Sequence, residues 1–157
     1  MTTPYQRERP LHRLLYTSIA GRQAAQDMAG LVCDILKVAV PRNAEVGVTG
    51  ALLACNDWFL QALEGERMAV GQVYGRVLND PRHEGLRVIQ AGPIESREFG
   101  AWSMCGQALS PTDDAILRTL KTRGDLNPAR FTAPAALRLL TVVGNLQARP
   151  APLARAG

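Results

Sequence analysis

The sequence predicts an α+β protein with a ferredoxin-like sheet, built in the order β-α-β-β-α-β-β. Both helices of this unit are expected on one sheet face, and further C-terminal helices are expected on the other face. Three observations carry the prediction. Strand-like stretches alternate with two helical stripes in this order, an Asn-Asp turn joins two adjacent apolar runs, and helix signals replace strand signals after residue 109. A length of 157 residues favours one domain with a short appendage.

The first strand is predicted over residues 11–17, following a polar lead at residues 1–10 that is expected to be disordered. A helical stripe follows it, because apolar side chains recur at i, i+3, i+4, i+7, i+8 and i+11. The stripe consists of Met28, Leu31, Val32, Ile35, Leu36 and Ala39. Pro41 is predicted to close this helix, which would place Arg42 and Asn43 just beyond it.

A hairpin is predicted next, with strands at residues 51–55 and 58–64 and its turn at Asn56-Asp57. A second helix follows at residues 68–78. Two more strands then complete the sheet, at residues 86–91 and 101–108.

Residues 110–147 are predicted to form a helical extension, and residues 148–157 a disordered tail. Ser110-Pro111 starts the first helix of the extension well, because serine caps helices and proline suits the first turn. This helix is expected to reach about Thr122. A second helix, capped by Thr132, would carry one apolar face made of Ala136, Leu139, Leu140 and Val143. These helices must dock on the open sheet face or on another chain.

Bulk properties narrow the classes of function. The net charge of +4 is dispersed, with no basic run interleaved with aromatic residues, so no nucleic-acid partner is expected. The three cysteines include no C-x-x-C pair, and neither a transmembrane stretch nor a secretory leader is visible, so we expect a cytoplasmic protein without a membrane partner. Nucleophile, phosphate-loop and metal-ligand motifs are missing, which predicts that the chain is not an enzyme and holds no metal.

Several polar or adaptable side chains stand in apolar settings. Gln61 shares a strand face with Phe59 and Leu63, where an amide without a partner would cost roughly 1–3 kcal/mol. The other members of the set are Tyr16, Asn43, Trp102 and Met104. Taken singly, Tyr16, Trp102 and Met104 are readily explained as core residues and Asn43 as a turn residue, while Gln61 divides evenly between structural and functional roles.

Taken together, these residues form a specific pattern. The segments LLYTS, RNAEVGVTGALLACNDWFLQALEGE, VYGRVLNDPRHEGLRVI and FGAWSM occur in the order and spacing of a BLUF domain, the blue-light sensor that uses flavin. The chain resembles this family over about residues 10–108, which assigns residues 11–109 as a flavin-binding sensor domain. The resemblance implies FAD, FMN or riboflavin bound non-covalently between the two helices.

The resemblance also implies a role for each matching residue. Tyr16 would donate an electron and a proton to the light-excited flavin, and Gln61 would bridge Tyr16 and the flavin and then rotate or tautomerise. Trp102 and Met104 match a pair that shifts when Gln61 rearranges. The expected flavin contacts are Tyr16, Ile35, Arg42, Asn43, Gln61, Arg82, His83 and Met104.

Two other functions stay open at this stage. One is a light-insensitive protein-interaction module on the same scaffold, with Tyr16 and Gln61 structural. The other is a small flavin enzyme, against which the lack of a general acid or base beside the site argues. Because residues 110–157 are too short for a cyclase or phosphodiesterase domain, a light signal would pass to a separate partner protein, or through a homo-oligomer formed by the sheet face or the C-terminal helices.

Overall fold

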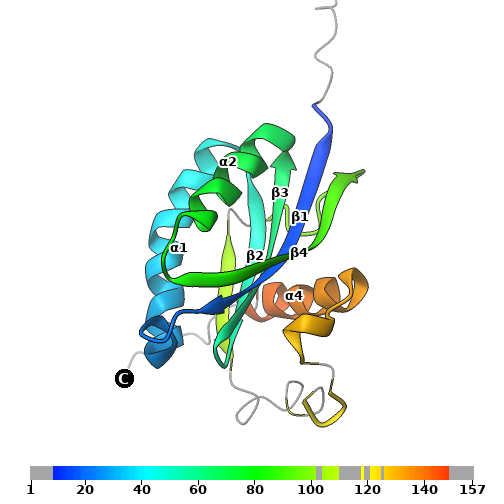
Figure 1. The fold of residues 1–157 in the computed structure, drawn as a ribbon. Helices are drawn as coiled ribbons and strands as arrows, with labels where there is room; N and C mark the ends of the chain where they lie inside the picture. The colour runs from blue at the N-terminus through cyan, green and yellow to red at the C-terminus, as the bar shows by residue number, and fades with distance from the viewer. Residues whose placement is uncertain (1–8, 102–103, 110–117, 119–120, 125, 149–157) are drawn as a thin grey trace, which may run out of the picture.

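The computed structural model describes residues 9–101, 104–109, 118, 121–124 and 126–148. Within these residues a five-stranded sheet forms the centre of the molecule, in the order β4-β1-β3-β2-β5 (Figure 1). The strands are β1 (Leu11–Ala20), β2 (Thr49–Cys55), β3 (Trp58–Glu66), β4 (His83–Ile94) and β5 (Cys105–Leu109). Neighbouring strands are antiparallel, except that β5 runs parallel to β2.

Helices cover both faces of this sheet (Figure 1). On one face lie α1 (Met28–Glu45), preceded by the 3-10 turn η1 (Ala24–Asp27), and α2 (Arg67–Leu78); on the other lies α4 (Ala133–Ala148), preceded by the 3-10 turn η2 (Pro128–Arg130). Helix α1 begins where the Asp27 side chain accepts a hydrogen bond from the Gly30 backbone N–H at 2.9 Å. The predicted α+β architecture is therefore confirmed, with α4 docked on the sheet.

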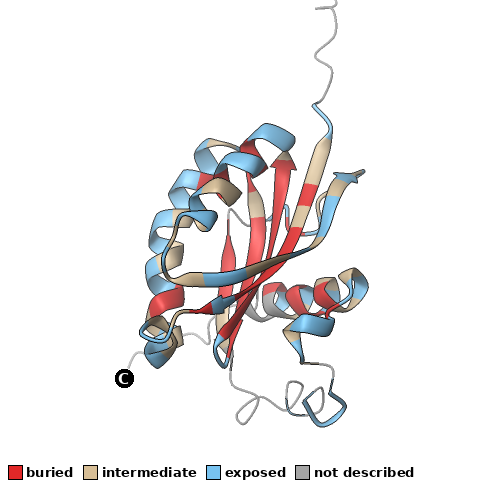
Figure 2. Ribbon diagram, viewed as in Figure 1, coloured by how far each residue is buried: buried red, intermediate tan, exposed pale blue. Residues whose placement is uncertain are grey.

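Strand alternation divides the interior into two cores, one on each face of the sheet. The central strands between them are buried along most of their length (Figure 2). In β3, Phe59 and Leu63 belong to the core beneath α1 and α2, whereas Leu60 and Ala62 belong to the core beneath α4. The predicted apolar face of α4 joins this second core, where Ala136, Leu139 and Leu140 are buried. The side chain of Val143 lies outside the described part.

The prediction that Pro41 closes the first helix is wrong, because α1 continues through it to Glu45. A proline inside a helix gives up one hydrogen bond. Here the last turn is secured beyond the proline, since the backbone N–H groups of Val46 and Val48 donate to the Asn43 carbonyl at 3.2 and 2.9 Å. Asn43 therefore belongs to the helix rather than to a turn after it.

Strand limits also differ from the prediction. β1 continues to Ala20 instead of ending at residue 17, so Tyr16 lies in its middle, and β4 begins at His83 rather than at residue 86. Both extensions follow from pairing, because Ala20 of β1 opposes His83 of β4. The last strand begins at Cys105, so Met104 immediately precedes it.

Some predicted features lie wholly or mainly outside the described residues. These are the disordered lead at 1–10, the helix at 110–122, the tail at 148–157 and Trp102. In the part of the chain that is described, no helix is long and apolar enough to cross a bilayer. The same residues contain no cluster of side chains suited to a metal ion.

Candidate functional site

A cavity of about 230 Å³ lies over the sheet face that α1 and α2 cover, which is called the helix side or helix face below, in contrast to the α4 face. Its walls are apolar side chains of α1, α2 and β2, and its polar groups come from α1, α2, β3, the turn between α2 and β4, and the first residue of β4. The lining residues are Ile35, Val38, Ala39, Arg42, Asn43, Leu52, Gln61, Val73, Arg76, Val77, Asp80, Arg82 and His83. Apolar walls with a few convergent polar groups are typical of a ligand site.

Gln61 lies at the centre of a buried hydrogen-bonded chain. Tyr16 opposes Gln61 directly in the β1–β3 ladder, and its phenol O–H donates to the Gln61 side-chain oxygen Oε1. The Gln61 amide nitrogen Nε2 in turn donates to the Met104 sulfur Sδ at 3.5 Å. Since all three side chains are at most 5% exposed, this chain is shielded from water.

Burial also fixes the protonation state of Tyr16. Desolvation, and secondly the nearby Tyr74, raise the pKa of the Tyr16 phenol far above its usual range. The phenol is therefore neutral at every physiological pH and always has a proton to donate. Its ring centroid lies 5.1 Å from that of Tyr74 on α2.

Asn43 and Arg42 approach the cavity from the last turn of α1. Asn43 is 2% exposed, so its amide is held in the protein interior at the cavity wall. An amide offers both donors and an acceptor, which suits the edge of a heterocycle that carries both kinds of group. Ile35, about two turns earlier on the same helix, adds an apolar wall.

Arg82 and His83 close the cavity at the start of β4. The Arg82 guanidinium forms an ion pair with Asp80 at 2.6 Å, and this hydrogen bond lowers the pKa of the Asp80 carboxyl. The His83 ring nitrogen Nδ1 lies 2.9 Å from the Ser18 hydroxyl, and the ring lies 4.7 Å from that of Phe59. Burial lowers the pKa of His83 below its ordinary value, which favours the neutral imidazole.

The structure thus brings most of the sequence-predicted site residues together. Ile35, Arg42, Asn43, Gln61, Arg82 and His83 line the cavity, and Tyr16 and Met104 contact Gln61. Trp102 lies outside the described residues. Two further polar residues of the cavity, Asp80 and Arg76, were not predicted from the sequence. The position of Arg76 on α2, one turn after Val73, was a usable signal for it.

Fold and site together define a ligand-binding α+β domain with a buried Tyr-Gln-Met chain beside its cavity. The family model described as "BLUF: Sensors of blue-light using FAD" matches residues 11–105. The chain belongs to the BLUF family, whose domain is a sensor module rather than an enzyme.

Relatives with catalytic names match this chain over a small part of their own length. The photoactivated adenylate cyclase subunit beta of Euglena longa is 36% identical over 131 residues, covering 78% of this chain and 15% of the relative. Subunit alpha of Euglena gracilis is 35% identical over 97 residues, covering 62% and 9%. The chain therefore spans a small part of the length of these curated relatives.

Two solved structures are similar over nearly their whole length. BlsA in its photo-activated state is 25% identical with a TM-score of 0.73, covering 84% of this chain and 95% of that chain. BlrB, a BLUF protein in its dark state, is 26% identical with a TM-score of 0.67, covering 88% and 97%. Both likenesses include residues beyond the matched family region.

The residues of the cavity fit the flavin that this family uses. The walls on α1 and α2 suit an apolar ring face, and the Asn43 and Gln61 amides suit a polar ring edge. Arg42, Arg76 and Arg82 exceed the single acid Asp80 in charge, which suits a phosphate-bearing tail. The side chains of the cavity therefore suit a flat, partly polar ring that carries an anionic tail.

Proposed function

We propose that this chain is a blue-light photoreceptor that binds a flavin non-covalently in the cavity between α1 and α2. The single observation that carries the proposal is the buried chain from Tyr16 through Gln61 to Met104 at the cavity. A bound flavin supplies a strong oxidant on absorbing blue light. The protein's own side chains bind and orient the ring and donate the electron and the proton.

Tyr16 is the proposed electron and proton donor. Its phenol is neutral and buried, and it is already hydrogen-bonded to the Gln61 amide. Loss of an electron to the excited flavin would make the phenol a much stronger acid, so its proton would move along that hydrogen bond to Gln61, and the amide would pass a proton on to the reduced flavin. When the electron and the proton return to Tyr16, Gln61 would be left with its donor and acceptor ends exchanged by rotation or tautomerisation, without a net change in charge.

Asn43, Arg42 and Ile35 are the proposed ring contacts on α1, and Arg82 and His83 are proposed to approach the tail of the flavin. The rearranged Gln61 can no longer make the same bond to Met104, which carries the change toward β5. Together with Trp102, Met104 would pass the signal to a partner protein. FAD, FMN and riboflavin share the same ring and differ in the tail, so the residues past the cavity would select among them.

Absorption spectra before and after blue light test the proposal. The purified protein should be yellow, its flavin absorption should shift to the red under blue light, and it should recover in the dark. A colourless protein that refuses added flavin would refute flavin binding, and a bound flavin without a reversible shift would refute the photoreceptor.

Tyr16→Phe tests the donor assignment. The variant should still bind flavin, because the ring packing is kept, but should lose the reversible red shift. Tyr74→Phe is the matched control, since Tyr74 is the neighbouring tyrosine and makes ring contact with Tyr16. A normal photocycle in Tyr16→Phe would show that the donor is another residue.

A further inference from the structure

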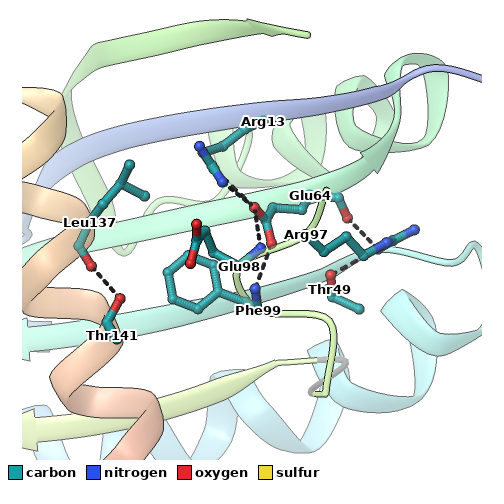
Figure 3. Close-up of polar contacts among 8 residues, drawn as sticks. All are labelled: Arg13, Thr49, Glu64, Arg97, Glu98, Phe99, Leu137 and Thr141. Carbon is teal, nitrogen blue, oxygen red and sulfur yellow. Dashed lines mark hydrogen bonds and ion pairs between the residues drawn. The ribbon is translucent and has the colours of Figure 1, made fainter. Parts of the chain in front are cut away.

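A fully buried carboxylate lies on the opposite side of β3 from Gln61. Glu64 is 0% exposed, and strand alternation places it with Leu60 and Ala62 on the α4 side. The Arg13 guanidinium contacts the Glu64 carboxylate at 2.8 and 2.9 Å, as Figure 3 shows. A charge is rarely buried so completely unless it is fully paired.

The Glu64 carboxylate also holds the backbone of the segment between β4 and β5. The backbone N–H of Phe99 donates to Oε1 at 2.7 Å, and that of Glu98 donates to Oε2 at 3.2 Å (Figure 3). Hydrogen bonds to a charged group are stronger than neutral ones. This part of the connection is therefore tied to the centre of the sheet rather than lying loosely over it.

Arg97 provides a second attachment for the same segment. Its guanidinium donates to the Thr49 hydroxyl at 2.8 Å, to the Glu64 carbonyl at 2.9 Å and to the Gly47 carbonyl at 2.8 Å. Figure 3 shows Arg97 reaching across to Thr49 beside Glu64. We call Arg13, Glu64, Arg97 and the backbone of residues 98–99 the Glu64 anchor.

The anchored segment leads directly to Met104. Phe99, 1% exposed in the core beneath α4, is fixed by packing as well as by Glu64. Five residues later the chain is on the helix side of the sheet, where Met104 is 5% exposed and its sulfur accepts from Gln61. Met104 therefore contacts Gln61 from a segment whose start is bonded to Gln61's own strand.

We propose that Glu64 and Arg97 are positioning residues: by holding residues 97–99 against the sheet, they set how closely Met104, five residues further along the chain, contacts Gln61. This inference rests on the proposed function. When residues 97–99 are held, the Met104 sulfur stays where it accepts a hydrogen bond from Gln61 in the dark. The same attachment opposes the displacement of Met104 that a rearranged Gln61 requires. Loosening the anchor would remove that restoring force, so the lit arrangement would decay more slowly.

Arg97→Ala is the test variant, because Arg97 is only half-buried and its loss removes three hydrogen bonds without leaving Arg13 unpaired. Glu98→Ala is the matched control, since Glu98 is adjacent and exposed and joins the anchor through its backbone N–H. Thr49→Val, which removes one acceptor of Arg97, replaces Arg97→Ala if that variant does not fold.

The first measurement is the methyl signal of Met104 in the dark, in protein with 13C-methyl methionine, assigned by Met104→Leu. The anchor predicts that Arg97→Ala shifts or broadens this signal while Glu98→Ala leaves it in place. An unchanged Met104 signal in Arg97→Ala would overturn the proposal. A purely structural role would lower the unfolding temperature without moving the methyl signal of the folded protein.

The second measurement is the dark recovery of the red-shifted absorption. We expect Arg97→Ala to recover about threefold more slowly or slower still, as for residues coupled through one contact network, and Glu98→Ala to recover at the original rate. Equal or faster recovery in Arg97→Ala would overturn the proposed restoring force. If the unsubstituted protein shows no light-induced shift, the proposed function fails, and the methyl signal still decides whether the anchor positions Met104.

Discussion

The two faces of the sheet bury polar side chains in different ways. On the α4 face, Glu64 is held by a guanidinium and by backbone N–H groups, all of them charge-assisted bonds. On the helix face, Gln61 has a neutral phenol on one side and a thioether on the other. Charge-assisted bonds are roughly twice as strong as neutral ones, and a sulfur is a weak acceptor. One network is therefore built to stay fixed and the other is able to exchange partners.

Gln61 and Glu64 belong to one strand and are both buried, yet Gln61 has weak, exchangeable partners and Glu64 has strong, charged ones. Gln61 and Glu64 are three positions apart, so alternation sends them to opposite faces. A rearrangement on the helix face thus occurs on a strand that the other face holds in register.

The largest expected effect comes from comparing Glu64→Ala with Gln61→Ala. Removing Glu64 leaves the Arg13 guanidinium buried without its partner, and should lower the free energy of unfolding by about 3–5 kcal/mol. Removing Gln61 leaves a buried phenol O–H without its acceptor, which should cost about 1–3 kcal/mol. Urea unfolding of both variants measures the difference.

Glu66→Ala is the control for the loss of an acid from the same strand. Glu66 pairs with the exposed Arg9 at 3.2 Å, and a surface pair of this kind contributes about 0–1 kcal/mol. Equal losses in Glu64→Ala and Gln61→Ala would remove the distinction between a fixed and an exchangeable network.

A smaller effect is expected from Gly50→Ala, on the helix side of β2. A Cβ at Gly50 would lie 2.0 Å from the Ala62 carbonyl oxygen and 3.1 Å from the Met104 methyl carbon Cε. Strand β2 must therefore move from β3 or Met104 must shift, at a cost of about 1–3 kcal/mol. The free energy of unfolding and the dark flavin spectrum should both change.

Gly71→Ala on α2 is the matched control, because a Cβ there meets nothing within 4 Å. Alanine in a helix should stabilise the protein by about 0.5–1 kcal/mol. A tolerated Gly50→Ala would mean that the helix side adapts more readily than the close approach of β2 and β3 indicates.

The smallest effect concerns pH and belongs to the helix face. Burial lowers the pKa of His83 below its ordinary value of 6.5, although Asp80 partly opposes this and Arg82 adds to it. Between these two pKa values the unfolded chain binds a proton that the folded protein does not, so stability falls as pH drops through about 6.5. Thermal unfolding at about pH 7.5 and about pH 5.5 measures this loss.

His83→Gln should reduce the loss of stability on acidification, because it removes the group whose pKa burial lowers. An identical pH response in His83→Gln would assign the acid sensitivity to groups other than His83.

Much of the fold could be predicted from local patterns. The stripe from Met28 to Ala39 and the Asn56-Asp57 turn determine a helix and a hairpin by periodicity and turn chemistry alone, and both are present. The end of α1 could not be predicted in this way. Pro41 favours a stop locally, yet α1 continues to Glu45, where bonds from Val46 and Val48 to the Asn43 carbonyl secure its end. The last strand was likewise misplaced, because its start depends on pairing with β2.

The sequence by itself determined the order of the elements, the awkward position of Gln61 among apolar neighbours, and the family pattern that relates it to Tyr16 and Met104. Only the tertiary structure decided that Glu64 lies buried behind Gln61 and accepts hydrogen bonds from the backbone of residues 98 and 99. Residue types and spacing fix which face of a strand a side chain takes. A partner 34 or 35 residues away along the chain is chosen by packing of the whole sheet, which no local pattern contains.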